Sequence, residues 1–206
     1  MKVFKIIVVV LFAISLFSCG SNKNFTASQK QFIHNNNNNN KEKPMRLFLI
    51  TNKKDSILLR KKSAYIKPNS KNKTLQLFAK RLITTVRDSA SLGVGIAAPQ
   101  VGILKNIIVV QRLDKDNEPF EVYLNPIINY YSNKKRPTTE GCLSIPNKTA
   151  ITLDRSFEIK IEYDKLDGTH NIETINNFVS VIFQHEIDHL NGILFIDHLL
   201  KESNKQ

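Results

Sequence analysis

Two histidines four residues apart give the sequence its strongest chemical signal. His185, Glu186 and His189 form an HExxH pattern inside an apolar segment. If that segment is helical, four residues advance it by slightly more than one turn, so both imidazoles leave the same face and can bind one cation. Glu186 then lies beside the cation without being needed as a ligand, as a general base acting on water does. Phe178 and Ile182 fall on the same face, which predicts an apolar recess.

A catalytic metal site needs a third protein ligand, and Cys142 is the main candidate. It lies in the segment EGCLS and is the one cysteine outside the N-terminal leader. As a thiolate beside two imidazoles it would complete a Cys/His/His set and leave one position open. A lone cysteine is also common as an inert core residue. His198 and Glu202 are alternative ligands, although we expect both to lie on a solvated final segment.

The segment GVGIAAPQ at residues 93–100 is suited to binding a peptide. Gly95 would let another group approach the backbone closely, and the Gln100 amide could donate a hydrogen bond to a carbonyl oxygen. The segment is not a P-loop, because no Gly-Lys-Ser/Thr follows it. Taken alone, it is equally well explained as a tight turn between a helix and a strand.

Apolar periodicity predicts the elements that would position these residues. Leu75, Phe78, Leu82 and Val86 recur at helical spacing. We expect helices at about 73–89 and 175–190, and strands at 106–111, 121–124, 127–131 and 157–163, the last followed by a turn at 167–168. Strands and helices do not alternate regularly. The set therefore indicates an α+β domain with short antiparallel strands around the HExxH helix.

The first 44 residues are interpreted as a leader and a tether. Residues 1–19 contain two lysines, an apolar run and Cys19, and resemble a bacterial lipoprotein signal whose cysteine becomes lipidated. An uncleaved N-terminal anchor is the alternative. Residues 20–44 include an unbroken asparagine run and are expected to be a disordered tether, with the catalytic domain at residues 45–206. Translation from Met45 would give a cytoplasmic protein without the leader.

The charge distribution argues against a nucleic-acid partner. The formal net charge is +12, but residues 1–88 carry a net +15 and residues 89–206 a net −3. The segments with the candidate ligands are therefore not set in a basic surface. The basic residues between 53 and 62 have no interleaved aromatic residues, which indicates a solvated face. Two cysteines also exclude a disulfide framework.

Together, GVGIAAPQ, EGCLS and QHEIDH resemble, in the same order, the three signature motifs of the peptide deformylase family. The resemblance runs from about Met45 to about Leu200. It implies an α+β fold and hydrolysis of the N-formyl group from the N-terminal formylmethionine of new polypeptides, with release of formate. It also implies one Fe²⁺ or Zn²⁺ per chain, held by Cys142, His185 and His189. This ligand set fits both metals.

The same motif positions imply roles for further residues. Glu186 would be the catalytic acid and base, and the Gln100 amide and the Leu143 backbone N–H would hold the oxyanion. The implied substrate-binding residues, which form a strand-like peptide site and an apolar pocket for a methionine-like side chain, are Val94, Gly95, Ile96, Gly141, Phe178, Val181 and Ile182. For Val181, a place in the core is nearly as well supported.

Two departures from the family pattern predict altered peptide selectivity. The arginine that often follows EGCLS in the family is missing, and Lys148 is the only basic residue nearby. Thr138 and Thr139 stand where more apolar residues commonly edge the pocket.

Three functions remain open at this point. The first is an active deformylase, either exported or made from Met45 in the cytosol. The second is a membrane-tethered metal amidase or peptidase acting on N-blocked peptides outside the cytoplasm. The third is a non-enzymatic peptide-binding lipoprotein. The expected partners are an N-formylated peptide or nascent polypeptide and, through lipidated Cys19, a membrane.

Overall fold

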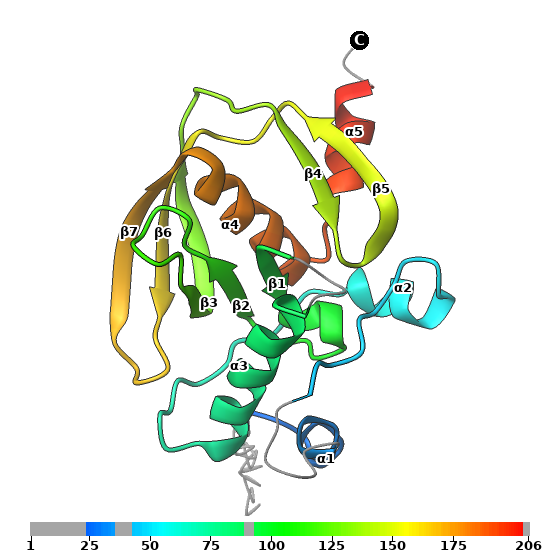
Figure 1. Ribbon diagram of the computed structural model, residues 1–206, viewed down its shortest axis with the longest axis vertical. Coiled ribbons are helices and arrows are strands. Elements are labelled where there is room, and N and C mark those ends of the chain that lie inside the picture. The colour runs from blue at the N-terminus through cyan, green and yellow to red at the C-terminus, as the bar shows by residue number, and fades with distance from the viewer. Residues whose placement is uncertain (1–23, 36–42, 89–92, 204–206) are drawn as a thin grey trace, which may run out of the picture.

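A five-stranded antiparallel sheet and a separate two-stranded hairpin flank one buried helix (Figure 1). The structure is a computed structural model that describes residues 24–35, 43–88 and 93–203. The sheet has the order β1 (Gly95–Ala97), β2 (Ile107–Gln111), β3 (Phe120–Tyr131), β6 (Glu158–Asp164) and β7 (His170–Asn176). The hairpin consists of β4 (Thr138–Cys142) and β5 (Ile145–Thr152). The expected α+β class is therefore confirmed.

Helix α4 (Asn177–Leu190) carries the HExxH residues and packs on one face of the five-stranded sheet. Most of its side chains are buried, including both polar and apolar ones, so it is an internal helix rather than an amphipathic surface helix. Gly192 ends it with φ +73°, and a Cβ there would lie 2.4 Å from the Arg60 carbonyl oxygen. Only glycine fits both the left-handed backbone and this close approach.

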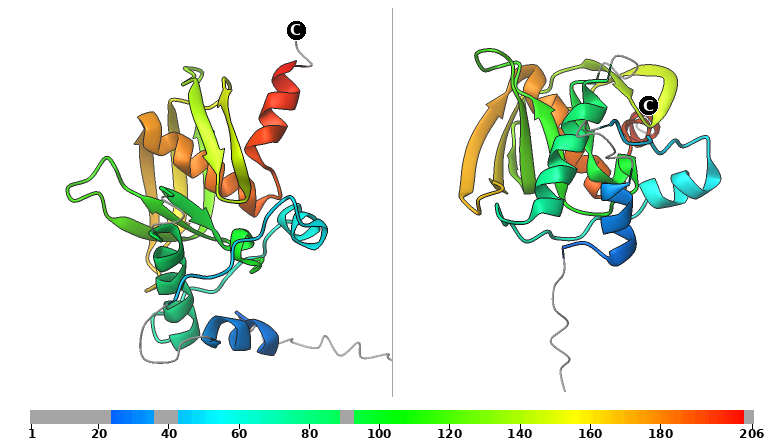
Figure 2. Two further views of the ribbon diagram at one scale, coloured as in Figure 1. Left: turned by 45° about the vertical axis from the view of Figure 1, so that its right-hand side comes forward. Right: turned by 60° about the horizontal axis from the view of Figure 1, so that its bottom comes forward.

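The remaining helices surround the base of the sheet and one end of the hairpin. They are α1 (Ala27–His34), α2 (Lys53–Leu59), α3 (Lys73–Val86), the short 3₁₀ helix η1 (Ala98–Val101) and α5 (Phe195–Ser203). Figure 2 shows α1 beside α3 and α5 beside the β4–β5 hairpin. The expected helix at 73–89 is confirmed as α3, and the basic residues between 53 and 62 are exposed as predicted. Among the described residues, no helix is both long and apolar enough to cross a bilayer.

Strand β3 differs from the two separate strands predicted around Pro126. It is continuous, but its register with β6 shifts between Leu124 and Ile127. Asn125 has φ +51°, and its side chain bonds both the N–H and the carbonyl of Ile66. The irregularity accommodates a proline without breaking the strand, because proline lacks the N–H that a regular ladder needs.

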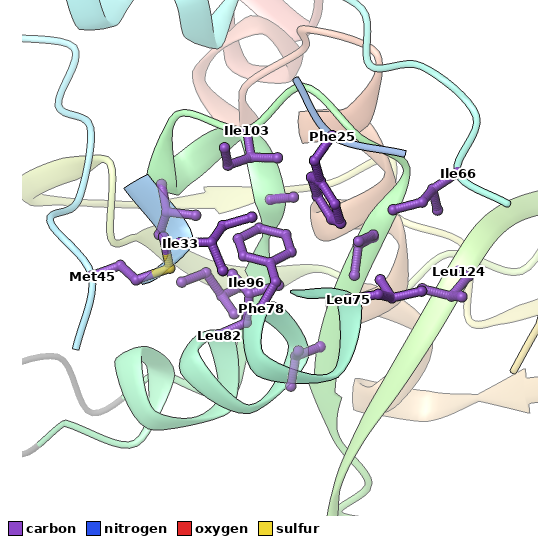
Figure 3. Close-up of a cluster of buried hydrophobic side chains, with 14 of the residues drawn as sticks. Phe25, Ile33, Met45, Ile66, Leu75, Phe78, Leu82, Ile96, Ile103 and Leu124 are labelled. Atoms are coloured by element: carbon purple, nitrogen blue, oxygen red, sulfur yellow. The ribbon is translucent and has the colours of Figure 1, made fainter. Parts of the chain in front are cut away.

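Residues 24–35 are ordered, so the expected disordered tether does not hold for this part of residues 20–44. We call residues 24–35 the N-terminal strap. Its Phe25 and Ile33 are fully buried, and the Phe25 and Phe78 rings meet edge to face with centroids 5.7 Å apart (Figure 3). Thr26 and Gln29 form a capping box that starts α1. Residues 1–19, with the predicted signal and Cys19, and the asparagines at 36–40 lie outside the described residues.

A buried arginine fixes the end of the strap. The Arg81 side chain on α3 donates hydrogen bonds to the carbonyl oxygens of Ile33 (2.7 Å), Phe32 and Asn35, and to that of Lys43. The last carbonyls of a helix have no partner within the helix, so a side-chain donor satisfies them. The strap is therefore held by apolar burial at two points, by the Arg81 guanidinium at its end, and by hydrogen bonds of Asn24 and His34.

Candidate metal centre and substrate cavity

The structure brings Cys142, His185 and His189 together, although Cys142 is distant from the histidines in sequence. One donor atom from each of the three lies within 4.8 Å of the others, and Cys142 Sγ is 3.2 Å from His189 Nε2. A tetrahedral ion with ligand bonds of about 2.0–2.3 Å separates its ligands by roughly 3.3–3.8 Å. The donor set therefore fits a divalent transition-metal ion, and the distance between Cys142 and His189 is close to this separation.

Glu140 orients one of the two histidines. His185 Nδ1 lies 2.7 Å from Glu140 Oε2, which leaves Nε2 facing Cys142 and His189. Glu140 is fixed in turn by Arg155, whose Nε donates to Oε1 (2.8 Å) and whose Nη2 donates to Oε2 (3.1 Å). Metal-binding histidines commonly donate their second ring N–H to a carboxylate in this way. Sequence reasoning assigned no role to Glu140, although it lies two residues before the proposed ligand Cys142.

The electrostatics of the cluster favour a thiolate beside cationic imidazole when no metal is bound. Burial opposes ionisation of Cys142, but His189 and His185 outweigh it and hold the pKa of the thiol well below its usual value. Burial also opposes protonation of His185, yet Cys142 and Glu140 raise the pKa of its imidazole well above normal. A divalent cation would replace these protons, since it needs a thiolate and neutral imidazoles as ligands.

Glu186 lies against the strand that would hold the substrate. Burial, aided by Cys142 and Glu140, raises the pKa of its carboxyl to about 7, although both histidines act in the opposite direction. Its Oε2 is buried and has no hydrogen-bond partner among the described residues. A Cβ on Gly95 would lie 2.5 Å from Glu186 Oε1. Glycine at position 95 therefore makes room for this carboxylate, as its predicted role in close approach requires.

Gln100 points its amide nitrogen into the cluster. Its Oε1 accepts a hydrogen bond from the Ala97 N–H at 2.8 Å, which fixes the orientation of the amide. Its Nε2 consequently faces Cys142 Sγ at 3.6 Å and Ser144 Oγ at 3.4 Å. A donor held in this way can be aimed at an oxygen that gains negative charge during a reaction.

A cavity of about 600 Å³ opens onto the cluster. Six of the seven predicted substrate-binding residues line it: Val94, Gly95, Gly141, Phe178, Val181 and Ile182. Ile96 is the exception, because its side chain is fully buried in the core between α3 and the sheet. Leu143, Thr139 and Lys148 also line the cavity.

The alternative ligand His198 is neither solvated nor close to the cluster. It lies on α5 with 13% of its side chain exposed, and its ring nitrogens contact Asp188 and Asp154. The expectation of a solvated histidine was wrong because α5 packs against the hairpin. The side chain of Glu202 lies outside the described part of the chain.

Comparisons with known proteins agree on one family. The family model described as polypeptide deformylase matches residues 47–205. A peptide deformylase of Buchnera aphidicola subsp. Cinara cedri is 44% identical over 122 residues, which cover 58% of this chain and 80% of the relative. A probable peptide deformylase from Synechococcus phage S-SSM7 superposes with a TM-score of 0.66 at 32% identity, covering 75% of this chain and 99% of the phage protein. A Met-Ala-Ser-bound class I type b peptide deformylase from Acinetobacter baumannii gives a TM-score of 0.66 at 30% identity, with coverage of 77% and 99%.

Proposed function

The chain belongs to the polypeptide deformylase family, and on this premise we propose how its residues carry out the reaction. The protein is a metal-dependent hydrolase that removes the N-formyl group from the N-terminal formylmethionine of polypeptides. Its products are formate and a free α-amino group. The observation that carries the residue assignment is the convergence of one thiol and two imidazoles beside a buried glutamate at the end of a cavity.

We assign Cys142, His185 and His189 as the ligands of one cation, Fe²⁺ or Zn²⁺. When bound, the cation polarises the formyl carbonyl and lowers the pKa of the water that attacks it. Glu140 keeps the His185 ring in the orientation and tautomer that binding requires. Iron and zinc share this donor chemistry, so the choice between them depends on geometry and on supply in the cell.

Glu186 moves the proton. As a carboxylate it takes a proton from the attacking water while the water oxygen bonds to the formyl carbon. It then gives that proton to the amide nitrogen as the carbon–nitrogen bond breaks, which releases the free amine and formate. Burial raises the pKa of this carboxyl above its usual value, and a carboxyl whose pKa is moved toward neutral pH is suited to both steps.

Two donors would stabilise the charge that builds on the formyl oxygen. The Gln100 amide is already held in place by the Ala97 N–H, and the Leu143 backbone N–H follows directly after the ligand Cys142. Donors that are oriented before the reaction cost no reorganisation when the charge develops. Losing one such donor typically slows turnover by about 10²–10³-fold.

The substrate peptide would extend along β1. This strand has β2 on one side and is the edge of the five-stranded sheet, so its other side can pair with an extended peptide. Phe178, Val181, Ile182 and Val94 would receive the first side chain. The Met-Ala-Ser ligand of the Acinetobacter baumannii relative supports this class of substrate.

Formate release from a formyl-Met-Ala-Ser peptide tests the function directly. Full-length protein is loaded with Fe²⁺ under anaerobic conditions or with Zn²⁺, and formate is quantified. We expect turnover that a chelator abolishes and that re-addition of metal restores. Turnover unchanged after complete metal removal would contradict the assignment of a metal centre.

For the location of the enzyme, we propose a lipid anchor at Cys19, and the alternative is a cytoplasmic product that begins at Met45. The buried Phe25 and Ile33 favour a mature protein that contains the N-terminal strap. Fatty-acid labelling of the wild type and of a Cys19→Ala variant, with the mass of the mature chain, tests the anchor. An unlabelled product that begins at Met45 would refute it.

A further inference from the structure

A chain of charged side chains leads away from the proposed metal ligand His185. Glu140 bonds His185, and Arg155 bridges Glu140 to Asp188, with Arg155 Nη1 2.6 Å from Asp188 Oδ2. His198 Nε2 lies 2.8 Å from the same Asp188 oxygen. The proposed catalytic mechanism gives Asp188 and His198 no part. Yet they are linked to a metal ligand by an unbroken series of contacts.

A second cavity, of about 230 Å³, lies at the outer end of this series of charged side chains. Arg155, Asp188, His198 and Asp154 line it, together with Tyr131, Lys135, Ser156 and Gln184. Side-chain exposure rises from 3% at Arg155 through 19% at Asp188 to 39% at Asp154. This series of charged side chains thus runs from the buried, proposed metal centre to partly solvated groups contributed by α5 and by the segment after β5.

His198 contacts an acidic group with each ring nitrogen. Nδ1 lies 2.8 Å from Asp154 Oδ2, and Nε2 lies 2.8 Å from Asp188 Oδ2. A neutral imidazole donates from only one nitrogen, whereas ionised carboxylates only accept. With both carboxylates ionised, both contacts are hydrogen bonds only if His198 is an imidazolium. The hydrogen bond with Asp188 raises the pKa of His198, against burial and the nearby Arg155.

The charges of the neighbouring groups explain why a positively charged side chain is needed beside Asp188. Arg155 is bonded to two carboxylates, Glu140 and Asp188. His198 supplies a second positive charge on the far side of Asp188 and fixes its rotamer. If Asp188 were free to move, Arg155 would lose the fixed position of one of its two carboxylate partners. The Glu140 carboxylate, which Thr152 also contacts, and the His185 ring would then be held less firmly.

We propose that His198, clamped by Asp154, is a positioning residue for the metal ligand His185 and acts through Asp188, Arg155 and Glu140. This inference rests on the proposed metal centre. Residues behind a metal ligand typically change metal affinity by about 10- to 100-fold when they are replaced. His198 acts at the fourth contact beyond the ligand, with Glu140, Arg155 and Asp188 between them, so we expect an effect near the lower end of that range.

The test measures Zn²⁺ affinity by competition with a chelating dye, using full-length protein from which metal has been removed. We expect His198→Phe to lower the affinity about tenfold, and Asp154→Asn to lower it by a smaller factor. The matched control is His170→Phe. His170 also pairs with an aspartate, Asp164 at 2.8 Å, but it is exposed on β7. The His170→Phe variant should bind Zn²⁺ with an affinity within about twofold of that of the wild type.

A second readout separates positioning from a purely structural role. Co²⁺ bound to the wild type should show thiolate and imidazole absorption bands, and His198→Phe should shift them, whereas His170→Phe should not. His198→Gln keeps a donor toward Asp188 and should restore part of the lost affinity. If His198→Phe fails to fold, the more exposed Asp154→Asn carries the test.

The outcomes distinguish the proposed metal centre from the proposed positioning role of His198. A wild type that binds no Zn²⁺ would refute the proposed metal centre itself. A wild type that binds Zn²⁺, with His198→Phe and Asp154→Asn variants of unchanged affinity and unchanged Co²⁺ spectra, would refute only the positioning role. A loss of affinity equal in His198→Phe and His170→Phe would also overturn it.

Discussion

The proposed metal centre and the two anchors of the N-terminal strap, Phe25 and Ile33, are largely buried, but different interactions hold them in place. The centre is a polar cluster in which Glu140, Arg155 and His185 contact one another through charged hydrogen bonds. The strap is fixed mainly by the apolar side chains of Phe25 and Ile33, with Arg81 at its end. The centre therefore carries groups that chemistry needs and burial penalises, whereas the strap carries groups whose burial stabilises the fold.

This difference predicts that the two regions can be damaged separately. Replacing a reactive group in the centre should remove activity and leave the fold intact. Replacing an anchor of the strap should weaken the fold and leave the chemistry intact at temperatures where the protein stays folded.

The largest expected effect follows from removing the carboxylate of Glu186. Glu186→Ala should lower formate release by about 10²–10⁴-fold, because proton transfer to and from the reacting groups is lost. Its melting temperature should not fall, because a buried carboxyl with a raised pKa is not a stabilising group. The control is Glu118→Gln, an exposed glutamate in the turn between β2 and β3. Equal turnover by both variants would show that Glu186 is not the acid and base.

The acidic limb of the pH profile should report the same carboxyl. Glu186 must be ionised to accept a proton from water, so activity is lost as the pH falls through its pKa. Burial raises that pKa to about 7 in the metal-free protein, and a bound cation stabilises the carboxylate, so the limb should lie at or below this value. Below its midpoint kcat/KM should fall about tenfold per pH unit. A profile of kcat/KM that stays flat from pH 8 to pH 4 would contradict this role.

The strap should respond in the opposite way. Phe25→Ala should lower the free energy of unfolding by about 3 kcal/mol, because it leaves a cavity against Phe78. Phe32→Ala, in the same strap but 37% exposed, should change it by less than about 0.5 kcal/mol. Urea unfolding measures both, and kcat of folded protein should be unchanged. Equal costs for the two variants would mean that the strap is not docked as described.

The smallest effect is the coupling between the two regions. Zn²⁺ binding should raise the free energy of unfolding by the same amount in wild type and in Phe25→Ala, to within about 0.5 kcal/mol, since no hydrogen bond or ion pair joins Phe25 to the proposed ligands in the described part of the chain. Unfolding curves with and without metal supply the four values required. A larger difference would show that the strap and the metal centre form one cooperative network.

The sequence predicted those residues whose chemistry follows from their type and their spacing. His185 and His189 share a helix face because of a fixed four-residue interval, and Gly95 and Gln100 lie in a short motif. The sequence did not predict the groups that we propose to act on the centre through other residues. Arg155 and His198 are linked to the centre only by tertiary contacts, because Arg155 bonds Glu140 and Asp188 and His198 bonds Asp188. No local sequence pattern encodes such contacts.

The strap was missed for a related reason. Phe25, Phe32 and Ile33 are the few large apolar residues in a polar stretch, so the stretch resembles a segment that buries nothing. The local signal was the spacing of Thr26 and Gln29, which is that of a capping box. Ile96 shows the converse error, because a motif residue next to Gly95 turns its side chain to the core rather than to the cavity. Alternation along a strand sends neighbours to opposite faces.

The central claim is that one thiolate and two imidazoles hold the metal, and X-ray absorption at the zinc edge tests it most directly. Zn²⁺-loaded full-length protein should show one sulfur neighbour at about 2.3 Å and nitrogen neighbours at about 2.0–2.1 Å. The sulfur signal should disappear in Cys142→Ser. A wild-type spectrum with only oxygen and nitrogen neighbours, or a sulfur signal that persists in Cys142→Ser, would contradict the account.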